Sequence, residues 1–130
     1  MAGLLFKDLD VYKIAHQIGF EVWELVNSWS YFNKDTLGKQ LIRSADSISL
    51  NLCEGYGRFY YKEKKVFYYY ARGSLYETFE CLKKASERNL IEENQFNKLA
   101  SDITLYGPKL NNFINSVGKS KQSTKVVSEK

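Results

Sequence analysis

Side chains of buried type recur along most of this chain at alternating spacings of three and four residues. This is the repeat of a helix that buries one face. Four such stripes follow one another and predict four amphipathic helices. Their members, in chain order, are Val11, Ala15, Ile18, Val22, Leu25 and Trp29; Leu37, Leu41, Ala45, Ile48 and Leu52; Tyr68, Ala71, Leu75, Thr78, Leu82 and Ala85; and Phe96, Leu99, Ile103, Tyr106, Leu110, Phe113 and Val117.

Polar residues and glycines predict where the second helix begins and ends. Asn33 or Asp35 can act as its N-cap, because either side chain accepts from a free backbone N–H group. The sequence EGYGR contains Gly55 and Gly57. Glycine disfavours the helix interior and supplies the left-handed conformation of a C-cap, so we expect the second helix to end here.

The turn between the third and fourth helices is also marked. The third helix is expected to run from about residue 62 to residue 88, and Asn89 follows it. The acidic pair Glu92–Glu93 suits the N-terminus of the next helix, where the backbone presents positive partial charge. Pro108 falls inside the fourth helix and predicts a kink, because proline removes one backbone donor.

Four amphipathic helices with short connections bury their stripes best against one another. The sequence therefore predicts an all-α fold, an antiparallel up-down-up-down four-helix bundle over residues 1–118. Residues 119–130 lack a helical repeat and contain four lysines against one glutamate, or +3 of the total charge of +4. We expect this segment to be a mobile basic tail.

Composition limits the class of protein. A chain of 130 residues with 44% hydrophobic and 26% charged residues fits one folded domain. No apolar run approaches the roughly 20 residues that cross a bilayer, so no membrane contact and a cytoplasmic location are expected. The helix assignment places Cys53 and Cys81 about 20 Å apart, which predicts two free, buried thiols.

Known catalytic patterns do not fit this chain. A di-iron bundle needs two Glu-x-x-His sequences, but His16 is the one histidine. Two cysteines and one histidine do not complete a tetrahedral zinc site, and EGYGR lacks the preceding strand of a phosphate-binding loop. We therefore expect no enzyme activity, no metal, no cofactor and no small-molecule substrate.

One polar group lies on the second and third helices: Arg43, Asn51, Glu54 and Glu77. Antiparallel packing would place Arg43 and Glu77 at the same level, where they can form charge-assisted hydrogen bonds. A ligand site or acid–base site is one interpretation. A structural polar network that fixes helix register is the favoured one, because no nucleophile and base accompany the pair.

The first helix has a second face opposite its core stripe. At 100° per residue this face gathers Leu9, Tyr12, His16, Phe20 and Trp23. Scattered apolar residues are common on protein surfaces. A continuous set of large side chains on one face is less common, and it predicts an interface with another subunit or partner.

Residues 56–72 combine positive charge with aromatic rings. Five cations stand against one acid, and seven aromatic residues lie between residues 59 and 70. Cations neutralise phosphates and rings stack on bases, so nucleic-acid binding is one interpretation. The alternative is a solvated helix start with Phe67 and Tyr68 in the core. The candidate nucleic-acid-binding residues are Arg58, Lys62, Lys64 and Lys65.

Three segments of the chain resemble a known family. They are FKDLDVY at residues 6–12, QLIRSADSISLNLCEGYGR at 40–58 and ARGSLYE at 71–77. They are similar to signatures of the bacterial four-helix-bundle 23S rRNA intervening-sequence proteins, whose distant relatives include accessory proteins of diversity-generating retroelements. The matching positions are Gln40, Arg43, Ser44, Ser47, Ile48, Asn51, Glu54, Gly55, Gly57 and Arg58, then Ala71, Gly73, Ser74, Leu75 and Glu77.

The resemblance implies a four-helix protomer and a ring-like homopentamer. It also implies a role with RNA or DNA, or with a protein that acts on nucleic acid. Two positions depart from the family pattern. Tyr12 stands where tryptophan is common, and Tyr60–Tyr61 stand where a small helix-capping residue is usual.

Two functions remain open from the sequence. The leading hypothesis is a homo-oligomeric, non-enzymatic scaffold that binds nucleic acid or a nucleic-acid-acting partner through a basic surface. The alternative is a protein–protein interaction module without nucleic-acid binding. Binding to RNA or DNA that weakens with salt would separate the two.

Overall fold

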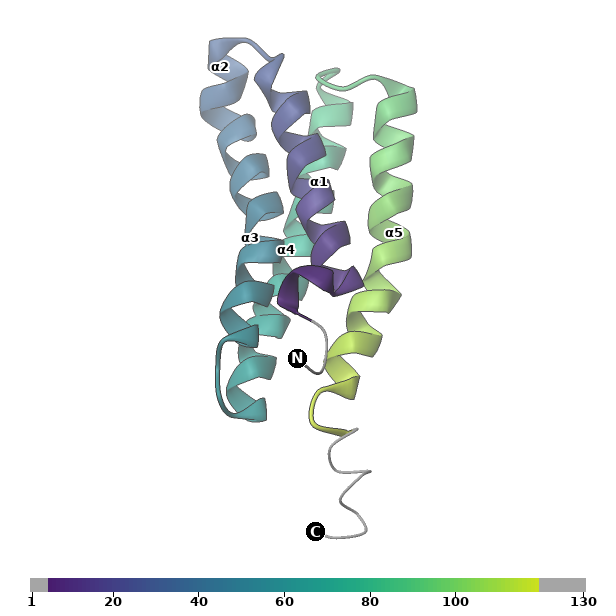
Figure 1. Cartoon of the computed structure of the whole chain (residues 1–130). Helices are drawn as coiled ribbons and strands as arrows, with labels where there is room; N and C mark the ends of the chain where they lie inside the picture. The colour runs from purple at the N-terminus through teal and green to yellow at the C-terminus, as the bar shows by residue number, and fades with distance from the viewer. Residues whose placement is uncertain (1–4, 120–130) are drawn as a thin grey trace, which may run out of the picture.

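The computed structural model describes residues 5–119, which form helices and turns (Figure 1). After the first long helix and the turn that ends at Ser30, three helical segments follow one another over residues 31–56 and form one continuous rod. Residues 5–119 therefore form four helical rods. The elements are η1 (Phe6–Asp8), α1 (Asp10–Asn27), α2 (Tyr31–Asn33), the π-helical η2 (Lys34–Gly38), α3 (Lys39–Tyr56), α4 (Tyr61–Glu87) and α5 (Glu93–Ser116).

The four rods lie side by side, and the turns that join them alternate between the two ends of the molecule (Figure 1). The α1–α2 and α4–α5 connections lie at the upper end in the figure, and the α3–α4 connection lies at the lower end. The arrangement is the four-helix bundle that the sequence predicts. Of the tail expected at 119–130, residues 120–130 lie outside the described residues.

The core forms along the predicted stripes. Every stripe residue of the first three predicted helices is buried. In α5, Leu99, Ile103, Tyr106 and Leu110 are buried, but Ile114 completes the stripe where Phe113 was expected. Phe113 is partly buried and packs its ring 5.0 Å from that of Tyr68. Within residues 5–119, no helix is long and apolar enough to cross a membrane.

The second rod begins earlier than predicted. Ser30 is the N-cap, and its hydroxyl oxygen accepts from the backbone N–H of Asn33 at 3.3 Å. Asn33 therefore lies inside the first turn, and neither Asn33 nor Asp35 caps the helix. Gly38 closes the π-helical segment where a Cβ atom would lie 2.7 Å from Val26 Cγ1. Close packing of this rod against α1 thus requires glycine there.

The glycines of EGYGR do not act as the sequence predicts. Gly55 lies inside α3 and is buried. A Cβ atom added there would lie only 2.7 Å from Tyr68 Cε1, so a larger residue would not fit. Gly57 follows the helix with φ −79°, which is not left-handed. Within residues 5–119, positive φ angles occur instead at Asn89, with φ 58° after α4, and at Gly118, with φ 86° after α5. Gly55 therefore permits close approach of α3 and α4.

The two cysteines differ in environment. Cys53 and Cys81 are both free, as expected, and burial raises the pKa of the Cys81 thiol. Cys53 is exposed, so the prediction of two buried thiols is wrong for this residue. It lies on α3 and directly follows the buried Leu52 in sequence.

α5 continues through Pro108 from Glu93 to Ser116. The proline therefore does not end the helix, although it cannot donate to the carbonyl one turn earlier. Pro108 and the adjacent Gly107 line a groove between α4 and α5 with a volume of about 350 Å³. The kink expected at Pro108 stays a prediction.

Candidate functional site

The α3–α4 turn lies at the lower end of the bundle (Figure 1), and two exposed aromatic residues belong to it. Phe59 is 83% exposed and Tyr60 is 62% exposed. Their rings meet edge to face with centroids 4.8 Å apart. Both residues precede the first turn of α4, which begins at Tyr61. Rings held in this way at the surface offer faces on which unpaired bases can stack.

Two of the four predicted cations hold the turn together. The guanidinium group of Arg58 donates to Glu54 at 2.6 Å and lies 4.7 Å from the ring centroid of Phe67. The ammonium group of Lys64 donates to the backbone carbonyl of Tyr56 at 2.7 Å, and burial lowers its pKa. These groups connect the end of α3 to the start of α4.

The other two cations are available for a ligand. Lys62 is exposed and Lys65 is partly exposed. Within residues 5–119, neither makes a hydrogen bond or ion pair. Tyr68 enters the core, whereas Phe67 is only partly buried. Most of the aromatic residues between 59 and 70 therefore lie at the surface.

The second face of α1 lies beside α3. Phe20 and Trp23 are about half exposed, at 52% and 54%. With His16, they line a shallow hollow of about 220 Å³ whose far side is formed by Asp46 and Ser49 of α3. The candidate interface of α1 is therefore continuous with exposed residues of α3.

The remaining members of this face are partly buried. Leu9 packs against the core, and the Tyr12 hydroxyl lies 3.4 Å from Nδ1 of His16. Tyr12 also contacts Phe6, with ring centroids 4.5 Å apart. Leu9 and Tyr12 thus support the N-terminal end of the face, and Phe20 and Trp23 form its accessible part.

Asp46 lies within this face in a partly desolvated position. α1 and α3 approach closely at Gly19, where a Cβ atom would lie 2.9 Å from Asp46 Oδ1. Burial raises the pKa of the Asp46 carboxyl group, and the nearby His16 opposes the shift. The carboxyl group therefore gives the apolar face one acidic centre.

The predicted polar network is not assembled. Arg43 and Glu77 are exposed, and within residues 5–119 neither makes an ion pair, so the predicted pairing is wrong. Asn51 donates to the backbone carbonyl of Ser47 at 2.8 Å, and Glu54 accepts from Arg58.

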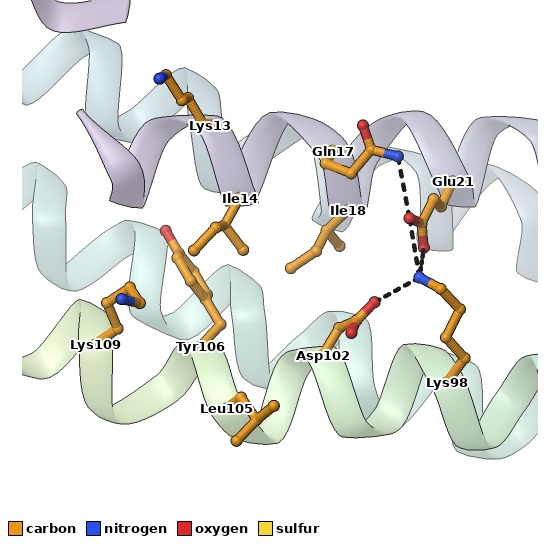
Figure 2. Close-up of a pocket in the computed structure, with 10 residues that line it drawn as sticks. All are labelled: Lys13, Ile14, Gln17, Ile18, Glu21, Lys98, Asp102, Leu105, Tyr106 and Lys109. Carbon is orange, nitrogen blue, oxygen red and sulfur yellow. Dashed lines mark hydrogen bonds and ion pairs between the residues drawn. The ribbon is translucent and has the colours of Figure 1, made fainter. Parts of the chain in front are cut away.

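A groove between α1 and α5 was not predicted from the sequence (Figure 2). It has a volume of about 490 Å³ and includes Ile14, Ile18 and Tyr106 among its lining residues. At one end, Lys98 bridges Glu21 at 3.2 Å and Asp102 at 2.8 Å. The four-residue spacing of Lys98 and Asp102 was a signal for their pairing, but the partner on α1 depends on helix register.

Lys13 and Lys109 lie at the other end of this groove (Figure 2). Tyr106 lies between the two ends, and its buried hydroxyl donates to the backbone carbonyl of Val11 at 2.7 Å. Burial raises the pKa of Tyr106 strongly.

Comparisons with known proteins agree with the fold. The family model described as 23S rRNA-intervening sequence protein matches residues 7–112. A similar crystal structure is that of a protein with unknown function from the S23 ribosomal protein family of Bacteroides thetaiotaomicron VPI-5482. It is 19% identical, with a TM-score of 0.71 over 80% of this chain and 97% of that chain. No curated protein matches the chain.

Proposed function

Because the chain belongs to the 23S rRNA-intervening sequence protein family, we propose that it is a non-enzymatic, homo-oligomeric scaffold that binds single-stranded nucleic acid at its α3–α4 turn. The exposed pair Phe59 and Tyr60 is the main support for this proposal. Stacking of one base on an aromatic ring contributes about 1–3 kcal/mol, and it tolerates any base sequence.

The lysines beside the rings supply the phosphate contacts. Lys62 and Lys65 have no intramolecular partner within residues 5–119, so their charges are available to a polyanion. Arg58 and Lys64 add positive potential while they hold the turn. A few phosphate contacts give weak, salt-dependent binding, with dissociation constants of about 10⁻⁴–10⁻⁶ M.

Assembly makes so small a site effective. We propose that the α1 face with Phe20 and Trp23 joins subunits, in the ring of five that the family resemblance implies. Repetition of the turn around a ring raises the local concentration of second contacts. Avidity can then exceed the affinity of one site by about 10²–10⁴.

The test compares two exposed aromatic pairs. Phe59→Ala with Tyr60→Ala removes the proposed stacking site, whereas Tyr31→Ala with Phe32→Ala removes a pair that is 80% and 72% exposed at the opposite end of the bundle. Binding of a fluorescent single-stranded RNA is followed by anisotropy. We expect a loss of about tenfold or more in the first variant and little change in the second. Equal losses, or no binding by the native protein, would contradict the proposal.

A second function is favoured by the internal use of two cations. Arg58 and Lys64 are engaged with Glu54 and with the Tyr56 carbonyl, which leaves fewer free charges at the turn than the sequence implies. The protein would then bind other proteins alone, including a protein that acts on nucleic acid. Stable oligomers that fail to bind RNA or DNA at low salt would favour this function.

A further inference from the structure

Four cationic side chains line one groove at the upper end of the bundle. Lys39 and Arg43 lie four residues apart on α3, and Lys84 and Arg88 have the same spacing at the end of α4. Residues four apart share one helix face, so each helix presents a pair of cations to the groove. Its volume is about 490 Å³, and its other lining residues are Asp35, Thr36, Leu37 and Gln40.

The two guanidinium groups are free to bind a ligand. Within residues 5–119, the side chains of Arg43 and Arg88 make no hydrogen bond or ion pair with the protein. Lys39 pairs with Asp35 at 2.9 Å and Lys84 with Glu80 at 3.6 Å, each one helical turn away. Exposed pairs of this kind contribute little to stability, so both lysines can also turn toward an anion.

The lining of this groove is more positive than the domain as a whole. Residues 1–118 carry a net charge of only +1, since 15 cations face 14 acids there. The groove lining holds four cations and one acid, Asp35, or +3. Like charges one turn apart on a helix repel each other. Their collection in one groove opposes folding, and an anion bound there relieves the repulsion.

We propose that this groove binds a phosphate group, which Arg43 and Arg88 hold from opposite walls. Guanidinium groups match phosphate oxygens with two parallel hydrogen bonds, and the Gln40 side-chain amide supplies a neutral donor. The phosphate belongs either to a nucleic-acid backbone or to a free nucleotide. This inference does not rest on the proposed function. The groove is lined by the first turns of α3 and the end of α4, which lie at the opposite end of the bundle from the α3–α4 turn (Figure 1).

The experiment removes the two guanidinium charges and compares a charge-matched control. The test variant is Arg43→Gln with Arg88→Gln. The control is Lys13→Gln with Lys109→Gln, which removes the same charge from the α1–α5 groove (Figure 2). Binding of inorganic phosphate, adenosine triphosphate and a short single-stranded RNA is measured by calorimetry and anisotropy. Circular dichroism checks that both variants keep their helices.

We expect the affinity of the arginine variant for its ligand to fall by about tenfold or more. The affinity of the lysine control should change by under about threefold. Binding of adenosine triphosphate or phosphate identifies a nucleotide site, whereas binding of RNA alone identifies a backbone site. Equal losses in both variants, or no binding of any probe by the folded native protein at low salt, would overturn the proposal.

The Phe59→Ala, Tyr60→Ala variant separates this site from the turn. RNA binding that depends on the arginines and not on the rings supports the groove and contradicts the proposed function of the turn. RNA binding that depends on the rings and survives the arginine changes, without binding of phosphate or adenosine triphosphate, overturns the groove and leaves the turn.

Discussion

The hydroxyl group of Thr78 donates a hydrogen bond of 3.1 Å to the hydroxyl oxygen of Ser44 inside the α3–α4 interface. Both side chains are buried, and each hydroxyl oxygen also lies near a carbonyl oxygen of its own helix, Thr78 at 2.7 Å from Ser74 and Ser44 at 3.1 Å from Leu41. The two hydroxyl hydrogens are therefore shared among three contacts. If the two helices packed in another register, these buried hydroxyls would lose each other as partners, which is unfavourable in an apolar interface. We expect this pair, in place of the predicted ion pair, to favour the observed register of α3 and α4.

A double-mutant cycle tests this contact. We expect Thr78→Val to lower the free energy of unfolding by about 1 kcal/mol, because the Ser44 hydroxyl loses a buried partner. Ser44→Ala with Thr78→Val should cost less than the sum of the single changes, since neither hydroxyl is then left without the other. Urea denaturation measures all three variants. Strict additivity would show that the hydroxyls do not interact.

Two glycines of adjacent helices should respond in opposite directions to alanine. Gly55→Ala places a Cβ atom 2.7 Å from Tyr68 Cε1 and 3.0 Å from the Lys64 carbonyl oxygen. We expect this change to lower the free energy of unfolding by about 1–3 kcal/mol. Gly73 lies inside α4 with nothing within 4 Å of an added Cβ atom. Gly73→Ala should raise the free energy of unfolding by about 0.5–1 kcal/mol, because alanine favours the helical conformation more than glycine does. Urea midpoints compare the two variants, and a stabilised Gly55→Ala protein would contradict the close packing.

The helix stripes could be predicted because burial repeats with the period of the helix. That period predicts which face of each helix is buried. Val22, Ile48 and Leu82 lie on the predicted faces and are buried. It does not distinguish a glycine that caps a helix from one that allows two helices to approach. The C-cap role predicted for Gly55 was therefore wrong. The Ser30 cap was missed because asparagine and aspartate three to five residues later are equally good capping residues.

Side-chain partners were harder to predict than burial. Arg43 and Glu77 lie on facing helices, but a shift of one turn decides whether two rim side chains meet. Arg43 instead shares a groove with Arg88. The spacing of Lys39 with Arg43 and of Lys84 with Arg88 was visible in the sequence. Their convergence required knowledge of how α3 and α4 are placed.

Tyr68 should make stability fall at high pH. Burial raises its pKa from 10.0 to about 12, so the unfolded chain loses this proton first. The free energy of unfolding then decreases by about 1.4 kcal/mol per pH unit for this group, between about pH 10 and pH 12. Tyr68→Phe should show a smaller decrease when urea unfolding is compared at neutral pH and about pH 11. If the free energy of unfolding decreases equally in both proteins, titration of groups other than Tyr68 causes the decrease.

The subunit interface is tested at Phe20. We expect Phe20→Lys to yield smaller species in light scattering while helicity is retained, because burying such a ring contributes roughly 1.5–3 kcal/mol per subunit. Leu105→Lys is the control, since Leu105 is exposed on α5 away from this face. A native protein that is monomeric at micromolar concentration would contradict the assembly.

The charge requirement of the α3–α4 turn is tested at Lys62 and Lys65. Lys62→Glu with Lys65→Glu should weaken binding of single-stranded RNA strongly and flatten its dependence on salt, because fewer counterions are released. Lys64 is left unchanged, since it bonds to the Tyr56 carbonyl. A chain that ends at Val117 is measured beside it. Loss of binding on truncation, with normal binding by the lysine variant, would move the contact to the C-terminal segment.

The hydrogen bond from Tyr106 to the Val11 carbonyl joins residues 95 positions apart in sequence. The contacts of α3 with α4 close much shorter loops, and chain entropy opposes long loops more than short ones. The α3–α4 hairpin is therefore the expected folding nucleus, and docking of α5 onto α1 is the last step. Reversal of that step gives the lowest-energy partial opening, so amides of α5 should exchange with solvent deuterium before those of α3.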